Sequence, residues 1–345
     1  MCKVNRREFL ATSTAFLSVA AEAELLGGRA MASAAQTVEA DQLAQDVYFH
    51  EGSLADNAPA VCNNGWILFE DYVLVVDANY PAGARLMISK IRALTDKPIR
   101  FAFDTHHHGD HAYGNQIYVE AGAVPVAHTG VIEEMRRGEP RNWEEDLKYR
   151  SDLKDTKLKA PSVLFPRELY FDDGKHRVEL MHLGVAHTHG DAVAWLPKEK
   201  ILFTGDVCVN GPYNYVGDGD VGKWIATLDA AKKLGAATIC TGHGPRSVAS
   251  VLDDQQAFFK VLQDQVHSRL ANAPPEESKA RIEEIRKTMK GNAQIARYVS
   301  VGGKDDGFPS QVQKVYEELT GNKLSAFADV GHLARRSHAH SHGSA

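Results

Sequence analysis

The chain has 345 residues, of which 43% are hydrophobic, so it can bury the core of one large domain or two smaller ones. Its formal net charge of −6 gives no basic surface of the kind that binds nucleic acid or an anionic membrane. These properties argue against nucleic acid as a partner.

Residues 1–35 carry the pattern of an export signal. Asn5-Arg6-Arg7-Glu8-Phe9-Leu10 resembles a twin-arginine motif, and a mildly apolar run follows from Leu10 to Ala23. Ala32 and Ala35 offer two cleavage sites, and the run is too short and too charged to span a membrane. We expect a periplasmic or secreted protein with no stable membrane anchor after cleavage. The competing interpretation is a charged N-terminal helix of a cytosolic protein.

Residues 36–250 are predicted to form the catalytic domain, which begins with strands and a helix. Residues 61–77 indicate two strands joined by a turn, and residues 84–94 place apolar side chains at helical spacing. Residues 101–104 then form a strand, and residues 114–126 a helix followed by a strand. The residues between 104 and 114 therefore begin where a predicted strand ends.

That segment, Thr105 to His111, holds four side chains that can bind a metal: His106, His108, Asp110 and His111. His106 and His108 are two residues apart, so in extended backbone they project to the same side and can share one ion. Gly109 is expected to turn the chain in a tight conformation, which directs the next two side chains at a second ion. Imidazole and carboxylate ligands suit zinc.

Residues 133–159 are highly charged and poor in β-branched residues, with Trp143 and Tyr149 as their main large rings. The composition predicts a helical insertion. Two interpretations are open: the insertion caps the active site, or it is a solvated surface hairpin.

Three further ligand candidates accompany strand-like runs downstream. His187 lies between predicted strands at 178–185 and 192–196. Asp206 follows the run beginning at Ile201, and His243 follows the run beginning at Thr238. The predicted partition puts the first metal on His106, His108 and His187, the second on Asp110, His111 and His243, and Asp206 between them as a bridge.

The loop at 210–220 follows Asp206 and is rich in Gly, Asn and Tyr. Loops beside a rigid scaffold commonly shape a substrate pocket. Tyr213 and Tyr215 are therefore candidate substrate contacts, against the alternative of ordinary turn chemistry. An amphipathic helix is predicted at 224–234.

The C-terminal part is predicted to be helical over 251–330, with helices at 247–270, 276–289 and 309–319. This extension packs on the catalytic domain or pairs subunits into a homo-oligomer. Residues 331–345 are expected to be a disordered His-rich tail.

Four cysteines occur, and Cys2 would be removed with the signal. The remaining three are an odd number, and a disulfide between Cys208 and Cys240 is left open.

The ordered ligand set resembles the metallo-β-lactamase superfamily, whose signature is His-x-His-x-Asp-His followed by a His, an Asp and a His. Val73-Leu74-Val75-Val76-Asp77 is also similar to an early strand of that family, whose final Asp supports the site. The resemblance covers roughly residues 45 to 250. It implies an α/β fold, a four-layer αββα sandwich with the metals at one edge, extended here by C-terminal helices.

The implied chemistry is hydrolysis by a metal-bound hydroxide, with two Zn²⁺ per chain and Asp110 as the catalytic acid–base group. Iron or manganese can replace zinc. Authentic β-lactamases of the superfamily carry Cys or Ser where this chain has Asp206. The expected substrate is therefore an ester, lactone, thioester or amide, with β-lactam cleavage as a side activity.

Two other functions compete with hydrolysis. Persulfide dioxygenases share this fold and hold one iron, for which His106, His187 and Asp206 would serve here. A non-catalytic metal-binding periplasmic protein is the third interpretation.

Overall fold

The computed structural model describes residues 41–55, 58–212, 214–300 and 306–324. The predicted signal segment and the His-rich tail lie outside these residues. No helix within the described ranges is both long and apolar enough to cross a membrane.

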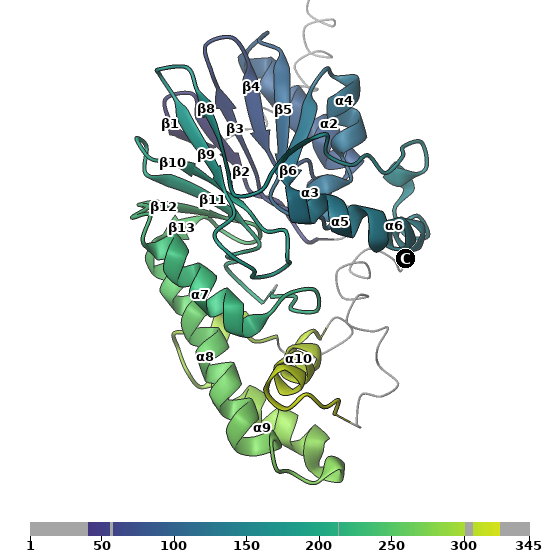
Figure 1. The fold of residues 1–345 in the computed structure, drawn as a ribbon, viewed down its shortest axis with the longest axis vertical. Helices are drawn as coiled ribbons and strands as arrows, with labels where there is room; N and C mark the ends of the chain where they lie inside the picture. Colours follow the sequence, from purple (N-terminus) through teal and green to yellow (C-terminus); the bar gives the residue numbers. More distant parts are fainter. Residues whose placement is uncertain (1–40, 56–57, 213, 301–305, 325–345) are drawn as a thin grey trace, which may run out of the picture. The chain divides into compact units, whose positions relative to one another are not determined.

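Two β-sheets form the inner part of the structure (Figure 1). The first sheet contains, in spatial order, β1 (Asp41–Ala44), β2 (Val47–His50), β3 (Asn64–Leu68), β4 (Val73–Val76), β5 (Ile99–Asp104), β6 (Val124–His128) and β7 (Val163–Phe165). The second contains β13 (Ser247–Val248), β12 (Thr238–Thr241), β11 (Ile201–Gly205), β10 (Val193–Leu196), β9 (Arg177–Met181) and β8 (Glu168–Asp172). The strand pairs β4–β5, β5–β6, β6–β7 and β11–β12 are parallel, and the other pairs are antiparallel.

Helices connect the strands and follow the last of them. Those before residue 150 are α2 (Pro81–Leu94), α3 (Gly109–Ala112), α4 (Asn115–Glu120), α5 (Thr129–Arg137) and α6 (Glu139–Asp146). The later ones are α7 (Val221–Lys232), α8 (Ser250–Leu270), α9 (Ser278–Lys290) and α10 (Phe308–Thr320). Single 3-10 turns lie at Ser151–Leu153, Pro275–Glu277 and Ala296–Tyr298.

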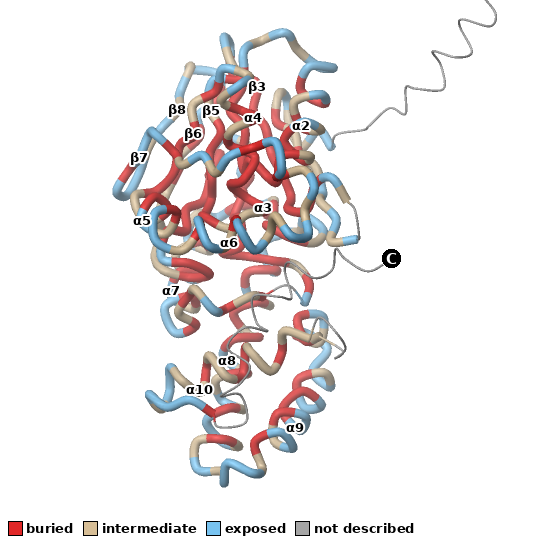
Figure 2. The backbone as a smooth tube through the Cα atoms, turned by 90° about the vertical axis from the view of Figure 1, so that its right-hand side faces the viewer, coloured by how far each residue is buried: buried red, intermediate tan, exposed pale blue. Residues whose placement is uncertain are grey.

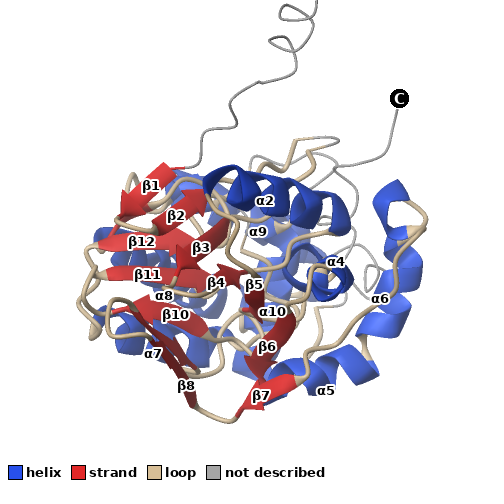
Figure 3. Ribbon diagram, turned by 90° about the horizontal axis from the view of Figure 1, so that it is seen from above, coloured by secondary structure: helices blue, strands red, loops and turns tan. Residues whose placement is uncertain are grey.

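The layers are those of a four-layer αββα sandwich (Figure 3). One apolar core lies between the sheets and takes side chains such as Phe49 and Phe103 from the first sheet and Leu180 and Phe203 from the second. A second core joins the outer face of the second sheet to α7 and the helices after it. Figure 2 shows that buried backbone runs through the strands. The predicted fold class is thus confirmed.

Several elements differ from prediction at their ends, and three of them show the physical reason. The strand predicted at 178–185 stops at Met181, because the chain leaves the sheet there and His182 Nδ1 contacts the Asp191 carbonyl at 2.7 Å. Residues Ser247–Val248 pair with β12 as an edge strand, so the long helix begins at Ser250 and not at 247. The helix predicted at 224–234 spans Val221–Lys232, because Asp220 accepts a hydrogen bond from the Lys223 amide and caps it.

Candidate metal centre

Strand ends bring the predicted ligands together. In the parallel pairs β4–β5 and β11–β12, the carboxyl ends of both strands lie at the same edge of the sheet. Asp77 follows β4, the segment 105–111 follows β5, Asp206 follows β11, and His243 comes two residues after β12. The fold therefore collects at one edge the residues that are dispersed over more than 160 positions of sequence.

The first predicted group is present as a compact cluster. One ligand atom from each of His106, His108 and His187 can be chosen so that all lie within 4.8 Å of one another. His187 Nε2 and His108 Nδ1 are 2.8 Å apart, and the His106 and His187 rings are perpendicular with centroids 4.8 Å apart. Three imidazole nitrogens converge on one position.

The second predicted group, Asp110, His111 and His243, also lies within 4.8 Å. Asp110 Oδ2 is 3.1 Å from His243 Nε2 and 3.6 Å from His111 Nε2, and the two Nε2 atoms are 3.4 Å apart. Asp110 and His111 are placed by the short helix α3. Its first residue, Gly109, does not adopt a left-handed conformation. The prediction of a glycine turn is wrong: a Cβ at Gly109 would lie 2.7 Å from the Tyr113 ring, so glycine is needed for close packing.

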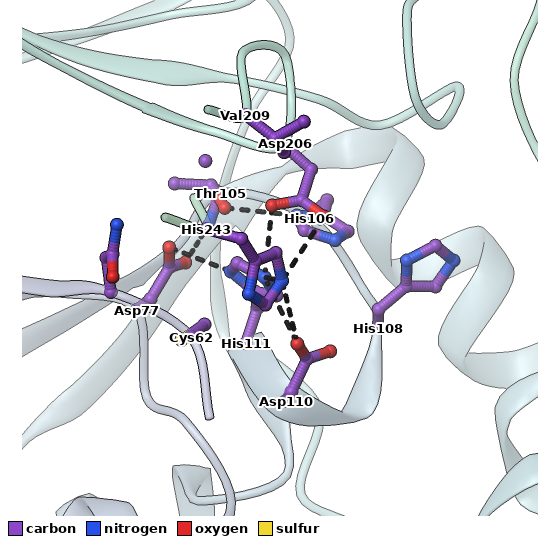
Figure 4. Close-up of polar contacts among 12 residues, drawn as sticks. Cys62, Asp77, Thr105, His106, His108, Asp110, His111, Asp206, Val209 and His243 are labelled. Atoms are coloured by element: carbon purple, nitrogen blue, oxygen red, sulfur yellow. Dashed lines mark hydrogen bonds and ion pairs between the residues drawn. The ribbon is translucent and has the colours of Figure 1, made fainter. Parts of the chain in front are cut away.

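Asp206 contacts imidazoles of both groups, and Figure 4 draws it beside the His243 and His111 rings. Its Oδ1 is 3.4 Å from His111 Nε2, and its Oδ2 is 3.5 Å from both His187 Nε2 and His243 Nε2. A Cβ at Gly242 would lie 1.9 Å from Asp206 Oδ1, so only glycine lets the His243 segment approach this closely. One carboxylate therefore contacts imidazoles of both groups.

Two of the imidazoles have their outer nitrogen held by a carboxylate. His111 Nδ1 is 2.9 Å from Asp77 Oδ2, and His108 Nε2 is 3.0 Å from Asp218 Oδ2. Asp77 has a left-handed backbone (φ 64°) and also accepts a hydrogen bond from the Thr105 amide, which ties the ends of β4 and β5 together. A carboxylate on the outer nitrogen fixes ring orientation and tautomer, so the inner nitrogen faces the centre.

Two other imidazoles have oxygen partners of a different kind. His106 Nδ1 is 3.1 Å from Thr105 Oγ1, and His187 Nδ1 is 2.8 Å from the Tyr215 carbonyl. The resulting array leaves His106 Nε2 buried with no hydrogen-bond partner. Asp206 Oδ1 is likewise buried with no hydrogen bond. Buried polar atoms normally have a hydrogen-bond partner. A buried imidazole nitrogen and a buried carboxylate oxygen without one are therefore suited to bind a metal ion.

The electrostatics of the centre follow from burial and neighbouring charge. Burial, with the surrounding imidazoles, holds the pKa of His106 well below 6.5, so this ring is neutral, the state in which an imidazole can bind a metal. Burial acts to raise the pKa of Asp206, but His243 and His111 outweigh it and hold this pKa below its ordinary value. Asp206 is therefore ionised, as a metal ligand must be.

The insertion at 133–159 packs beside the metal loop. Trp143 and Leu153 are buried against Tyr113 and Tyr80, and the ring centroids of Trp143 and Tyr113 are 4.8 Å apart. Glu139, 1% exposed, accepts a hydrogen bond from the Tyr113 hydroxyl. Its Oε1 is 3.7 Å from His107 Nε2. The segment is helical over α5 and α6, as predicted, and is not helical after the 3-10 turn at Ser151–Leu153. These contacts show that it is not a solvated hairpin, whereas a cap over the active site stays a prediction.

The burial of Asp146 in this insertion can be tested through the pH dependence of stability. Burial raises the pKa of Asp146 from 3.8 to about 7, and its Oδ2 accepts a hydrogen bond from the Tyr80 hydroxyl. A group with a raised folded-state pKa stabilises the fold at low pH and loses this contribution as pH rises toward 7. Asp146→Asn should therefore leave stability unchanged near pH 4 and raise it by about 1–3 kcal/mol near pH 8.

Urea unfolding of both proteins across this pH range gives the measurement. Asp155→Asn, on an exposed residue of the same insertion, is the control and should show no such trend. An equal stability difference at both pH values would show that the Asp146 pKa is not raised by folding.

The candidate substrate contacts have different outcomes. Tyr213 lies outside the described residues. Tyr215 lies beside the first group, with its ring centroid 5.6 Å from that of His108. The backbone carbonyl of Tyr215 also lies 2.8 Å from His187 Nδ1.

Sequence reasoning missed Asp218, Glu139 and the hydroxyl of Thr105. Thr105 stands in the segment that carried four ligand candidates, and Asp218 stands in the loop that carried the candidate substrate contacts. This proximity was the available signal. Glu139 gave none, because its partner Tyr113 is 26 positions away.

Cys62, Cys208 and Cys240 are buried free thiols, so the disulfide left open between the latter two is absent. Burial raises the pKa of Cys62 to about 12, and it raises the pKa of the other two as well. The three thiols are therefore neutral, and Cys62 Sγ accepts a hydrogen bond from Asn79 Nδ2 at 3.3 Å.

Comparison with known proteins agrees with this geometry. Residues 58–243 match the family model described as metallo-beta-lactamase superfamily. A metallo-beta-lactamase type 2 from Bacillus cereus is 26% identical over 216 residues, which cover 60% of this chain and 77% of that protein. One from Pseudomonas aeruginosa is 27% identical over 104 residues, covering 29% of this chain and 41% of the other.

Solved structures share the fold at low identity. A metallo-beta-lactamase from Pontibacter korlensis superposes with a TM-score of 0.53 at 18% identity, covering 64% of this chain and 98% of that one. The metallo-beta-lactamase FIM-1 from Pseudomonas aeruginosa in its mono-zinc form gives 0.51 at 20% identity, with 64% and 94% covered. The chain belongs to the metallo-beta-lactamase superfamily, and within that class it is a metal-dependent hydrolase.

Proposed function

We propose that the protein is an exported dinuclear zinc hydrolase that cleaves an ester, lactone, thioester or amide bond of a small molecule. One observation carries the proposal: Asp206 Oδ2 is 3.5 Å from an imidazole of each three-ligand group. Seven nitrogen and oxygen donors exceed what one tetrahedral ion uses. The same donors accept iron or manganese, which metal analysis would distinguish from zinc.

When bound, paired metals of this kind lower the pKa of water and polarise a substrate carbonyl. The protein's own contribution is to orient the ligands and move protons. Asp110 is 9% exposed, whereas His106 and His111 are fully buried, so of these three side chains Asp110 is the one that solvent reaches. Its carboxylate is assigned to orient the attacking water, receive its proton and return it to the leaving group.

Asp206 favours ester, lactone or thioester substrates over β-lactams, because β-lactamases of the superfamily carry Cys or Ser at this position. The named relatives are nevertheless β-lactamases. β-Lactam cleavage is therefore proposed as a side activity.

A panel of phenyl acetate, a lactone, an acyl thioester and nitrocefin tests the proposed function. Hydrolysis of the first three classes is expected to exceed that of nitrocefin, to stop after treatment with a chelator and to return with zinc. Activity that survives complete metal removal, or oxygen consumption with a persulfide and no hydrolysis in the panel, would contradict it.

Export is proposed from the twin-arginine pattern. Replacing both Arg6 and Arg7 with lysine is expected to leave uncleaved protein in the cytoplasm, because the export receptor reads the paired guanidinium groups. Arg29→Lys, in the same segment but outside the motif, serves as control. Fractionation followed by N-terminal sequencing gives the answer, and unchanged periplasmic delivery of the double variant would refute twin-arginine export.

A further inference from the structure

We infer that the C-terminal helices position the ligands of the first metal group, and that they act through the loop at 206–220. The family match ends at residue 243, so the helices α8 and α10 and the turn at Ala296–Tyr298 lie beyond it. The inference rests on the proposed two-metal centre and assigns part of its assembly to this extension.

The loop contacts two ligands of the first group directly. The Asp218 carboxylate is 3.0 Å from His108 Nε2, and the Tyr215 carbonyl is 2.8 Å from His187 Nδ1. The Asp220 amide also donates to the carbonyl of Ala186, the residue before His187. The loop thus sets the orientation of two of the three imidazoles.

The C-terminal extension in turn forms hydrogen bonds to the loop at several residues. On α8, Gln255 is fully buried; it accepts from the Val209 amide at 2.7 Å and donates to the Val207 carbonyl at 3.3 Å. Arg297 donates to Asn210 Oδ1 at 3.0 Å.

Helix α10 holds the second half of the loop. Gln311, 4% exposed, donates to the buried Asn214 carbonyl at 2.6 Å. Both carboxylate oxygens of Glu318 accept from the Val221 amide at 3.1 Å, where the loop enters α7. Gln311 therefore acts on the residue beside Tyr215, and Glu318 acts three residues after Asp218.

The second metal group is supported differently. His111 is oriented by Asp77, at the end of β4 in the first sheet. The loop meets His243 through its backbone, with the Asn210 amide donating to the His243 carbonyl. Neither Gln311 nor Glu318 makes that contact, so releasing α10 from the loop should affect the first group selectively.

The test combines Gln311→Leu, which keeps most of the volume and removes the donor, with Glu318→Ala. Gln313→Leu is the matched control, because Gln313 lies on the same helix and donates to Glu317 within it. Each change is placed in two full-length backgrounds. His243→Ala leaves the first group as the intact three-ligand site, and His187→Ala leaves the second.

Zinc affinity of each protein is measured by competition with a fluorescent chelator. The Gln311 and Glu318 changes together are expected to weaken zinc binding about tenfold or more in the His243→Ala background. In the His187→Ala background, and with the control, zinc affinity should stay within about threefold.

Equal weakening in both backgrounds would mean general destabilisation and would overturn the inference, as would unchanged affinity in both. The proposed function fails separately: an unsubstituted protein that binds fewer than two zinc ions contradicts the dinuclear hydrolase. The inference itself is decided by the affinities in the two single-site backgrounds, and a His243→Ala protein that binds no zinc overturns it as well.

Discussion

Asp110→Asn is expected to lower kcat on the best substrate of the panel by about 10² to 10⁴, the range typical of general acid–base groups. The amide retains the shape of the side chain but cannot accept the proton. The first group is unchanged, because His106, His108 and His187 keep their contacts with Thr105, Asp218 and Tyr215. One zinc ion per chain should therefore remain bound.

Steady-state kinetics with metal analysis of the same samples gives both values. Asp229→Asn makes the same charge change on an exposed residue of α7 and is the control. Activity of Asp110→Asn within a few-fold of the unsubstituted protein would show that another group handles the proton.

Asp206→Cys is expected to give the second large effect. The carboxylate contacts imidazoles of both groups through its two oxygens, whereas a thiolate has one sulfur and tends to hold a single zinc ion. The substitution should reduce zinc occupancy below two per chain and lower ester or lactone hydrolysis by about 10- to 100-fold, the loss typical when the surroundings of a metal are disturbed. Cleavage of nitrocefin should fall less or rise.

Zinc content and rates on phenyl acetate and nitrocefin are measured together. Cys208→Ser provides the control for thiol chemistry, since Cys208 is buried two residues away. Two bound zinc ions and unaltered ester hydrolysis in Asp206→Cys would mean that Asp206 is not the bridge.

The sequence predicted where the ligands meet, for a clear physical reason. Four of the ligand candidates follow strands whose apolar runs can be recognised from a few consecutive residues. They are His106, His108, Asp206 and His243. The carboxyl ends of neighbouring parallel strands share one edge, so ligands at those ends must be close once the sheets form. Periodicity likewise indicated α2 and the extension's helices, because their apolar faces repeat at helical spacing.

Other features depend on contacts that no local pattern encodes. The edge strand at Ser247–Val248 is too short for its own pattern and exists through pairing with β12. The residue type of Gly109 predicts a turn, whereas the structure needs glycine there because the Tyr113 ring packs against it. The hydrogen bond from Gln311 to Asn214 joins positions 97 residues apart, and no local pattern in either segment predicts this pairing.

The central claim is that two metal ions share Asp206. Elemental analysis of the full chain, purified without added metal and dialysed against metal-free buffer, tests it most directly when paired with Asp206→Ala. We expect close to two zinc ions per unsubstituted chain and a clear loss in the variant. A single iron ion per unsubstituted chain, or two zinc ions retained by Asp206→Ala, would contradict it.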